Sequence, residues 1–496
     1  MEPRPETRLV VVSNRLPITL WQESGEWQVH PGSGGLVTAL VPVLKNRGGL
    51  WIGWLGTSEA VEFEKLEPAT EDLGYKLIPV GLTAEDVKGF YYGFANEIIW
   101  PLFHDLQTRC NFAPEYWQAY VEVNRKFAEV VARESRPTDY IWVHDYHLML
   151  AGRTLRQRVP GLKTGFFLHI PFPSVDIFLK LPWRVQVLQA LLDYDLIGFQ
   201  TMRDRRNFIE CIQYLHPEIK TRGRGAVLSI PWGERQVRIG AFPIGIDFHG
   251  FAERADSQEV ADQAWLIHEA LPNRQIILGL DRLDYTKGIP ERLEAFRNAL
   301  SRYPDLHGKV TLVQFVVPSR EEVPMYQTLK SQIERMVGEI NGRFTRPGWV
   351  PIHYLYRRLE WDELIAYYRT SEIALVTPLK DGMNLVAKEY CACTLEENGV
   401  LILSEFAGAA AQLHRNALLV NPYHIEAVAD AIHRAFQMEE GERKFRMRRL
   451  RESIRTFNVF DWVDSFLQAA FAIKLRDFPT LEEYHPPIHA GENPPK

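Results

Sequence analysis

The sequence predicts an α/β protein with two doubly wound domains, each built on a parallel sheet. Apolar runs of strand length alternate with longer segments of helical periodicity along nearly all of the 496 residues, which is typical of helices covering both faces of a sheet. Several runs are apolar at every position, as parallel strands buried on both faces must be. The chain has more strands than one doubly wound domain usually holds, and it is longer than one domain of about 100–200 residues. We therefore expect two domains.

The predicted strands follow one another in chain order, and helical segments separate most of them. They are Leu9–Val12, Leu50–Trp54, Tyr140–Val143, Thr164–Leu168, Leu196–Phe199, Val237–Ile239, Ile276–Leu280, Val310–Val316, Ile352–Leu355, Ile373–Val376, Leu401–Ser404 and Leu418–Val420. In sheets of this kind ligands bind outside the carboxyl ends of the strands, and clefts between domains are favoured sites.

The domain boundary is predicted at the turn from Phe242 to Asp247. This turn ends one series of strands, and a polar helical stretch separates it from the next strand at Ile276. The first domain is therefore expected at residues 1–247 and the second at residues 248–458. Residues 479–496 end in the proline-rich run HPPIHAGENPPK and are expected to be a flexible tail.

Composition excludes several classes of function. A net charge of -6 gives no basic surface for nucleic acid, and no apolar run approaches the ~20 residues that span a membrane. The amino terminus lacks the cleavage site of a signal peptide. The four cysteines, Cys110, Cys211, Cys391 and Cys393, are too few for a disulfide framework and indicate the cytoplasm. Cys391 and Cys393 have no second Cys/His pair at zinc spacing, so no metal site is expected there.

The segment TPLKDGMNLVAKEY, from Thr377 to Tyr390, predicts an anion site. An apolar strand leads into a turn at Asp381 and Gly382, and a helical pattern begins near Met383. Such a turn directs unpaired backbone N–H groups and a helix dipole at a ligand, and phosphate is the usual one. A carboxylate would repel phosphate, so Asp381 indicates a second partner, such as the hydroxyl groups of an attached sugar.

Two other strand ends in the second half carry cations. Arg282 and Lys287 lie in the run DRLDYTKG, beside a glycine that precedes a helix. Two cations and helix N–H groups suit a diphosphate whose charge grows as it departs. Arg320 follows the strand Val310–Val316 and is suited to bidentate binding of a phosphate monoester.

Polar residues also follow the strands of the first half. Arg15 follows the first strand, and a Gly-Ser-Gly-Gly run that ends at Gly35 precedes a helix, without the third glycine of a dinucleotide fingerprint. His144–His147 and His169 follow two further strands, where they fit either metal ligands or sugar contacts, and no HExxH pair supports the metal. Asp193 and Asp195 precede a strand, so we interpret this D-x-D as a helix-to-strand turn.

Together these segments resemble the retaining glycosyltransferases of family 20, the trehalose-6-phosphate synthases. The resemblance covers the chain from about Leu9 to Ala472. Its specific pieces are VVVSNRLP, SGGLVTAL, GGLWIGW, Trp100 with the following FHD, WVHDYHLML, FFLHIPFPS, YDLIGFQT, DRLDYTKGIPER, INGRF, DGMNLVAKEY and LSEFAGAA.

The resemblance implies a GT-B fold, in which two Rossmann-like domains face each other across a cleft. A final helix, at residues 459–478, would cross back to the first domain. The implied reaction moves glucose from UDP-glucose, or another nucleoside diphosphate glucose, to glucose-6-phosphate, giving trehalose-6-phosphate. Configuration would be retained by front-face attack. No cofactor and no metal are implied, and a homo-oligomer, dimer or tetramer, is common among such enzymes.

The resemblance also implies roles for individual residues. Donor contacts would come from Gly35, His169, Arg282, Lys287, Asp381, Gly382, Met383, Asn384, Leu385, Val386 and Glu389, with Glu389 holding the ribose. Acceptor contacts would come from Arg15, Trp54, Tyr92, Trp100, Asp145 and Arg320. The catalytic residues would be Asp145, His169, Arg282, Lys287 and Asp381.

Three other functions remain open. A glucosylglycerol-phosphate synthase would use glycerol-3-phosphate, although Arg15 and Trp54 follow the trehalose pattern. A non-catalytic homologue that senses sugar phosphates would be expected to show damage at Arg282 or Asp381, and both are intact. A glycoside hydrolase needs a carboxylate pair, but the phosphate-binding cations would then have no role. The segment Tyr356–Leu359 does not reveal the nucleotide base, and a long loop, Gln22–Pro31, departs from the family.

Overall fold

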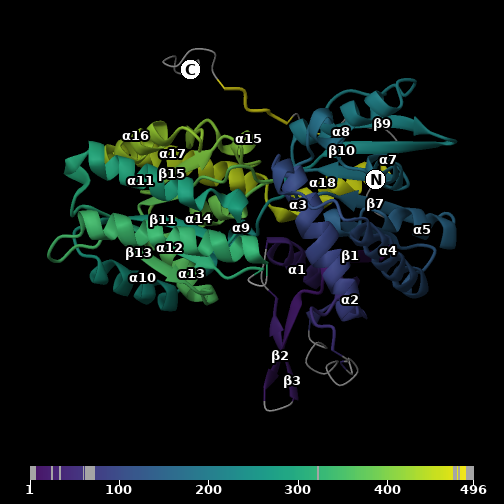
Figure 1. The fold of residues 1–496 in the computed structure, drawn as a ribbon, viewed down its shortest axis with the longest axis horizontal. Helices are drawn as coiled ribbons and strands as arrows, with labels where there is room; N and C mark the ends of the chain where they lie inside the picture. The colour runs from purple at the N-terminus through teal and green to yellow at the C-terminus, as the bar shows by residue number, and fades with distance from the viewer. Residues whose placement is uncertain are drawn as a thin grey trace. The chain divides into compact units, whose positions relative to one another are not determined.

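The computed structural model describes residues 7–23, 26–32, 35–59, 61, 73–320, 323–472, 478 and 481–486. The chain forms two compact units, coloured by residue number in Figure 1. Unit 1 contains Met1–Asp247 and Phe457–Leu481, and unit 2 contains Phe248–Thr456 and Glu482–Lys496.

Unit 1 is built on an eight-stranded sheet with the order β5-β4-β1-β6-β7-β8-β10-β9. Its strands are β1 Leu9–Arg15, β4 Leu50–Trp54, β5 Lys76–Val80, β6 Tyr140–His144, β7 Lys163–Phe167, β8 Leu196–Phe199, β9 Val227–Trp232 and β10 Arg235–Ala241. Neighbouring strands pair in parallel except at the edge, where β9 runs antiparallel to β10. The predicted parallel sheet is confirmed, whereas β5 and β9 were not predicted.

A separate two-stranded ribbon replaces the loop predicted at Gln22–Pro31. Strands β2 Ile18–Glu23 and β3 Glu26–Pro31 pair in antiparallel order, with residues 24–25 outside the described part. The loop prediction was therefore wrong, because two runs rich in β-branched and aromatic residues that lie close together in the chain favour a hairpin. The ribbon closes on Gly32, whose N–H donates to the carbonyl of Pro17 at 2.8 Å.

The helices of unit 1 join and cover these strands. They are α1 Gly35–Arg47, α2 Ala84–Asp86, η4 Val87–Ile99, α3 Trp100–Phe103, η5 Gln107–Arg109, α4 Pro114–Glu134, η6 Tyr146–Leu148, α5 Ala151–Arg158, α6 Val175–Phe178, α7 Arg184–Leu191, α8 Met202–Leu215 and α18 Val459–Phe471. The element η4 is a π-helix of 13 residues, a rare form that is frequent at functional sites.

The last helix, α18, completes the core of unit 1. Phe466 stacks on Trp142 of β6, with the ring centroids 4.3 Å apart. Glycines make room for it in the sheet, because a Cβ at Gly165 or Gly198 would lie 2.9 or 2.7 Å from the Phe466 ring. In Figure 1 this helix lies among the strands of unit 1, although it follows unit 2 in the chain.

Unit 2 is built on a six-stranded parallel sheet with the order β13-β12-β11-β14-β15-β16. The strands are β11 Gln275–Arg282, β12 Val310–Val317, β13 Ile352–Tyr356, β14 Ile373–Val376, β15 Val400–Ser404 and β16 Leu418–Val420. The helices are α9 Phe248–Asp256, α10 Gln258–Ala270, η7 Tyr285–Lys287, α11 Ile289–Arg302, η8 Pro304–Leu306, α12 Pro324–Phe344, α13 Trp361–Thr370, α14 Leu385–Cys393, α15 Ala410–Leu413, α16 Ile425–Gln437 and α17 Glu440–Thr456.

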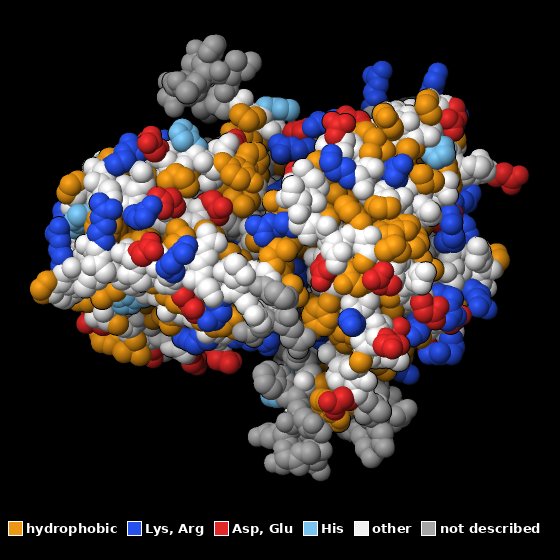
Figure 2. Space-filling view, in the orientation of Figure 1, with side chains coloured by type: hydrophobic (Ala, Val, Ile, Leu, Met, Phe, Trp, Pro, Cys, Tyr) orange, Lys and Arg blue, Asp and Glu red, His pale blue; other side chains and the backbone are white. Residues whose placement is uncertain are grey.

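The surface of each unit carries charges of both signs. Figure 2 shows basic and acidic side chains interspersed on the visible face. Among the described residues, no helix combines the length and apolarity needed to cross a membrane. The beginning of the predicted tail has a fixed contact in unit 2, since Arg415 donates to Glu482 at 2.7 Å.

Candidate active site

The turn between β14 and α14 is held by backbone bonds to the segment that follows β15. The N–H of Asp381 donates to the carbonyl of Phe406 at 3.2 Å, and the N–H of Gly408 donates to the carbonyl of Asp381 at 3.1 Å. A Cβ at Gly408 would lie 1.8 Å from the carbonyl oxygen of Gly382, so only glycine allows this approach. The turn that carries Asp381 is therefore fixed before any ligand binds.

Helix α14 begins directly after this turn. Asn384 is its N-cap residue, and its side chain accepts a hydrogen bond from the N–H of Ala387 at 3.4 Å. The backbone of Leu385 and Val386 lies in the first turn of the helix, where a phosphate would meet N–H groups and the positive end of the dipole. The predicted strand-turn-helix arrangement is confirmed, with the helix starting two residues later than expected.

Lys287 and Asp381 form an ion pair at the ends of two neighbouring strands of unit 2. Lys287 Nζ lies 2.5 Å from Asp381 Oδ2, and both side chains are mostly buried. Asn384 Nδ2 donates to the same carboxylate oxygen at 3.2 Å. Arg282 ends β11 and is exposed. A cation, a carboxylate and a helix start therefore converge at the carboxyl edge of this sheet.

A buried arginine lies beneath this group. Arg292 of α11 is 1% exposed, and it donates to Asp281 at 2.5 Å, to Thr377 Oγ1 at 3.1 Å and to Gln314 Oε1 at 3.2 Å. These three residues belong to β11, to the end of β14 and to β12. Burial raises the pKa of the Asp281 carboxyl, even with the guanidinium beside it. Arg292 thus joins the strand ends that carry the predicted donor site.

Arg320 lies in a second buried group of unit 2. Its Nη1 donates to Tyr326 Oη at 2.5 Å and to Asp284 Oδ2 at 3.4 Å. Asp284 also accepts from the N–H and the hydroxyl of Thr286, at 2.9 and 2.8 Å. One carboxylate therefore contacts both the turn before Lys287 and the predicted acceptor cation. Its pKa stays below the usual range, since these partners outweigh the effect of its burial.

Glu389 lies in α14 and accepts a hydrogen bond from Tyr368 Oη at 2.8 Å. Burial raises the pKa of Glu389 to about 7. The neighbouring Lys388 is fully buried, and burial lowers its pKa to about 7. Near neutral pH, Glu389 is therefore able to act as a hydrogen-bond donor or as an acceptor.

In unit 1, Arg15 lies over aromatic rings. Its guanidinium is 4.3 Å from the ring centre of Trp54 and 5.9 Å from that of Tyr91. Tyr92 packs at the edge of Tyr91, with the ring centroids 5.2 Å apart. Gly56 leaves space for the guanidinium, since a Cβ at this position would lie 1.7 Å from Arg15 Nη1. Aromatic faces beside an arginine hold its planar group in a set orientation.

The remaining predicted residues of unit 1 belong to different elements, namely α3, α1 and β4. Trp100 is 6% exposed and packs on Tyr146, with the ring centroids 5.7 Å apart. Gly35 is the first residue of α1, and Gly34 of the same motif lies outside the described residues. Trp54 is buried, and its indole N–H donates to the carbonyl of Thr57 at 2.8 Å.

Asp145 and His169 follow β6 and β7 and contact each other. The main-chain N–H of His169 donates to Asp145 Oδ1 at 3.3 Å. The ring of His169 lies between two side chains, with Nε2 3.1 Å from His144 Nδ1 and Nδ1 3.3 Å from Gln200 Nε2. Burial lowers the pKa of His169 to about 3, so the ring is neutral.

Backbone strain coincides with the predicted site. Asp145, Arg320 and Asn384 all have positive φ, at 74°, 52° and 70°. They are three of the six non-glycine residues with positive φ in the described part of the chain. Such conformations cost of order 1–3 kcal/mol each and concentrate at functional sites, so their presence supports these positions.

Some relevant residues were not predicted. Arg292 and Gly56 show no pattern that distinguishes them from other helix and turn residues. Gln200 directly follows the strand Leu196–Phe199. Its position as a polar residue at a strand end, the same signal that predicts His169, would have identified it. The D-x-D prediction is confirmed, because Asp195 precedes β8 and is held by Arg156 at 2.9 Å. No cluster of metal-ligating side chains occurs among the residues that the structure describes.

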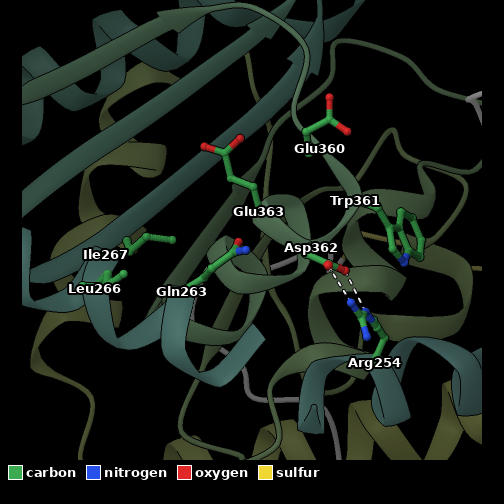
Figure 3. A pocket seen from close by; sticks show the side chains of 8 residues that line it. All are labelled: Arg254, Gln263, Leu266, Ile267, Glu360, Trp361, Asp362 and Glu363. Atoms are coloured by element: carbon green, nitrogen blue, oxygen red, sulfur yellow. Dashed lines mark hydrogen bonds and ion pairs between the residues drawn. The ribbon is translucent and has the colours of Figure 1, made fainter. Parts of the chain in front are cut away.

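A surface pocket of unit 2 lies away from these residues. It holds about 820 Å³ and is lined by Arg254, Gln263, Leu266, Ile267, Glu360, Trp361, Asp362 and Glu363. Figure 3 shows Arg254 turned toward Asp362, to which it donates two hydrogen bonds of 2.7 and 2.5 Å. None of the predicted site residues lines it, so its size does not make it the candidate site.

Two Rossmann-like parallel-sheet units, with cations and a carboxylate at the strand ends of the second, define a GT-B glycosyltransferase. Residues 7–471 match Glycosyltransferase family 20. The chain belongs to this family.

Similar proteins agree with this membership. The trehalose-6-phosphate synthase of Mycolicibacterium gilvum is 44% identical over 477 residues, which is 94% of either chain. A UDP-forming α,α-trehalose-phosphate synthase of Burkholderia xenovorans, solved with glucose-6-phosphate, has a TM-score of 0.84 at 35% identity and covers 93% of this chain and 99% of its own. An E. coli structure named for trehalose-6-phosphate, with UDP-2-fluoro glucose bound, has a TM-score of 0.83 at 37% identity and covers 94% and 100%.

Proposed function

We propose that this chain transfers glucose from UDP-glucose to glucose-6-phosphate and releases UDP and trehalose-6-phosphate, with retention of configuration. The observation that carries the proposal is the ion pair between Lys287, which follows β11, and Asp381, which lies in the turn before α14, while Arg282 ends β11 as an exposed cation. Family membership and the ligands of the B. xenovorans and E. coli relatives support it.

The donor is proposed to bind at the strand ends of unit 2. Arg282, Lys287 and the first turn of α14 would bind the diphosphate, and Asp381 would accept hydrogen bonds from hydroxyls of the glucose. Glu389 would contact the ribose. As the anomeric bond to the diphosphate breaks, charge grows on the departing oxygens, and preorganised cations stabilise that charge.

The acceptor is proposed to bind through two arginines and a carboxylate. In unit 1, Arg15, held against Trp54, is proposed to bind the phosphate, and Tyr92 and Trp100 are proposed as further contacts. In unit 2, Arg320, held by Asp284 and Tyr326, is proposed separately as a phosphate-binding cation. Asp145 would bind sugar hydroxyls. The attacking oxygen forms the new bond on the face that the diphosphate leaves, and its proton passes to the departing phosphate. No residue is then needed as a covalent nucleophile.

A matrix of donors and acceptors tests this function. UDP-, GDP- and ADP-glucose are each combined with glucose-6-phosphate and glycerol-3-phosphate, and the products are identified. Turnover is expected with UDP-glucose and glucose-6-phosphate. Turnover with glycerol-3-phosphate alone would establish a glucosylglycerol-phosphate synthase, and no turnover in any pair would favour a sensing homologue.

Two variants test the site within this function. Arg282→Ala and Asp381→Ala are each expected to lose about 100-fold or more of transfer, by analogy with the loss of one oxyanion donor. The melting temperature should stay close to that of the parent. Near-normal turnover in either purified variant would overturn the proposed site.

Three further properties belong to the proposal. Transfer needs no metal or other cofactor, so activity should persist in excess chelator, and loss reversed by a divalent ion would refute this. A reducing cytoplasm suits the four cysteines, which are all free thiols. A homo-oligomer, dimer or tetramer, is expected, and light scattering after size exclusion measures it.

A further inference from the structure

Gln200 has one defined amide orientation. The main-chain N–H of Ile244 donates to Gln200 Oε1 at 2.9 Å, and the side chain is 1% exposed. Turning the amide over would set its NH₂ group against this N–H. The backbone of Ile244 therefore fixes which end of the amide faces His169, and that end is Nε2.

This orientation decides the tautomer of His169. Gln200 Nε2 is a donor, so His169 Nδ1, 3.3 Å away, must accept and carries no proton. The proton of the neutral ring is then on Nε2, which donates to His144 Nδ1 at 3.1 Å. A second proton on His169 would sit on Nδ1, where its N–H would face the NH₂ donor of Gln200. The hydrogen-bond network thus leaves one arrangement of protons.

The surroundings of the ring reinforce the neutral form. Phe167 and Trp462 lie against it, with ring centroids 4.7 and 6.0 Å away. The carboxylate of Asp145 accepts a hydrogen bond from the main-chain N–H of His169 at 3.3 Å. His144 is fully buried, and burial lowers its pKa well below the ordinary value.

We propose that Gln200 is a positioning residue that holds His169 as the neutral Nε2–H tautomer, with its ring fixed between Gln200 and His144. This inference rests on the proposed function only for the place of His169 beside the transferred sugar. Both ring nitrogens are engaged within the protein, so His169 does not exchange a proton during turnover. Its ring is an uncharged surface of the site, and the hydrogen bonds to Gln200 and His144 fix its orientation.

The first test reads the tautomer directly, in the full-length protein without substrates. Histidine is labelled with ¹⁵N, and the His169 signals are identified by their loss in His169→Gln. Between pH 5 and pH 9 the parent should keep an unprotonated Nδ1 and a protonated Nε2. A ring that gains a second proton in this range, or that carries its proton on Nδ1, would overturn the proposal.

The second test reverses the polarity of the contact. In Gln200→Glu a carboxylate faces Nδ1 and accepts from it, so the ring should carry a proton on Nδ1, and its pKa should rise. Transfer should fall by up to about 100-fold, because small displacements at a reacting centre cost about that much. The fall should deepen as pH decreases. The exposed Gln213→Glu in α8 adds the same charge to unit 1 and should change neither property.

Gln200→Met separates orientation from charge and covers the case in which Gln200→Glu does not fold. It removes both hydrogen bonds of the amide at similar volume. The His169 signals should then show a mixture of tautomers and turnover should fall, with the melting temperature checked. An unchanged tautomer in both variants would refute the role of Gln200. Failure of the donor and acceptor matrix with the expected tautomer intact would instead count against the proposed function.

Discussion

Lys287 Nζ lies 2.5 Å from Asp381 Oδ2, so the two groups proposed for the diphosphate and for the glucose hydroxyls bind each other. Both are mostly buried, where an ion pair is screened less than at the surface. A diphosphate that approaches Lys287 competes with Asp381 and is repelled by it. Nucleotide binding and sugar recognition are therefore coupled through this one contact.

This coupling predicts opposite effects of Asp381→Asn on two measurements. Transfer should fall by about 100-fold or more, as expected when an interaction with the reacting sugar is lost. Binding of UDP alone, measured by calorimetry, should be unchanged or tighter, because Lys287 is released and the repelling carboxylate is gone. Arg282→Ala is the control and should weaken UDP binding. Parallel losses of UDP affinity and turnover in Asp381→Asn would contradict the coupling.

Gly56→Ala should weaken acceptor binding with little effect on the donor. Gly56 has a φ of 93°, and a Cβ there would lie 1.7 Å from Arg15 Nη1. Displacing this guanidinium should cost about 1.5–3 kcal/mol of charge-assisted hydrogen bonding, which raises the KM for glucose-6-phosphate roughly 10- to 150-fold.

Gly81→Ala is the matched control for this variant. A Cβ at Gly81 has no heavy atom within 4 Å, and its φ is not positive. Its kinetic constants should equal those of the parent. An equal increase in the KM for UDP-glucose in Gly56→Ala would show general disturbance instead of a displaced Arg15.

Glu389 predicts a pH dependence of nucleotide binding. Burial raises its pKa from 4.5 to about 7. The ionised carboxylate accepts hydrogen bonds from ribose hydroxyls on both oxygens, whereas the protonated form carries a proton on one of them. Affinity for UDP should therefore increase as pH rises through about 7, and Glu389→Gln should abolish the increase. Burial brings the pKa of Lys388 to about 7 as well, so Lys388→Met is the control. It should keep the increase in UDP affinity if Glu389 is the group that titrates.

The same shift affects stability with a defined sign. Between pH 4.5 and about 7 the folded carboxyl of Glu389 keeps a proton that the unfolded chain has released. Its contribution is therefore fully present below pH 4.5 and is lost as pH rises through about 7. Urea unfolding measures the free energy of unfolding of the parent and of Glu389→Gln across this pH range. This free energy should fall less with rising pH in the variant than in the parent.

Arg292→Met should destabilise unit 2 more than most substitutions. It removes one partner of a buried ion pair and leaves Asp281 uncompensated, which typically costs about 3–5 kcal/mol. Denaturant unfolding measures this loss. The double variant Arg292→Met/Asp281→Leu should recover part of it, because no buried charge then remains. A double variant that is less stable than Arg292→Met would show that Asp281 has other essential partners.

Strand positions and strand-end residues could be predicted because their signals are local. Arg282, Asp145 and His169 follow apolar runs, and parallel strands bring such ends to one edge. The contacts between Arg292 and Thr377, or between Gln200 and His169, join residues dozens of positions apart, and no local pattern encodes them. The ribbon β2–β3 was not predicted for another reason, since its two short strands lie in a segment that departs from the family and was expected to be a long loop. The strand β9, VLSIPW, was not predicted because a proline within a short apolar run weakens the signal of a strand.

Helix α18 has a consequence for how the chain is made. Residues leave the ribosome in order, and domains generally fold as units during synthesis. The sheet face that holds Trp142 receives Phe466 only after Thr456, the last helical residue of unit 2, has been synthesised. The amino-terminal unit therefore completes its core last, although it is the first to be synthesised.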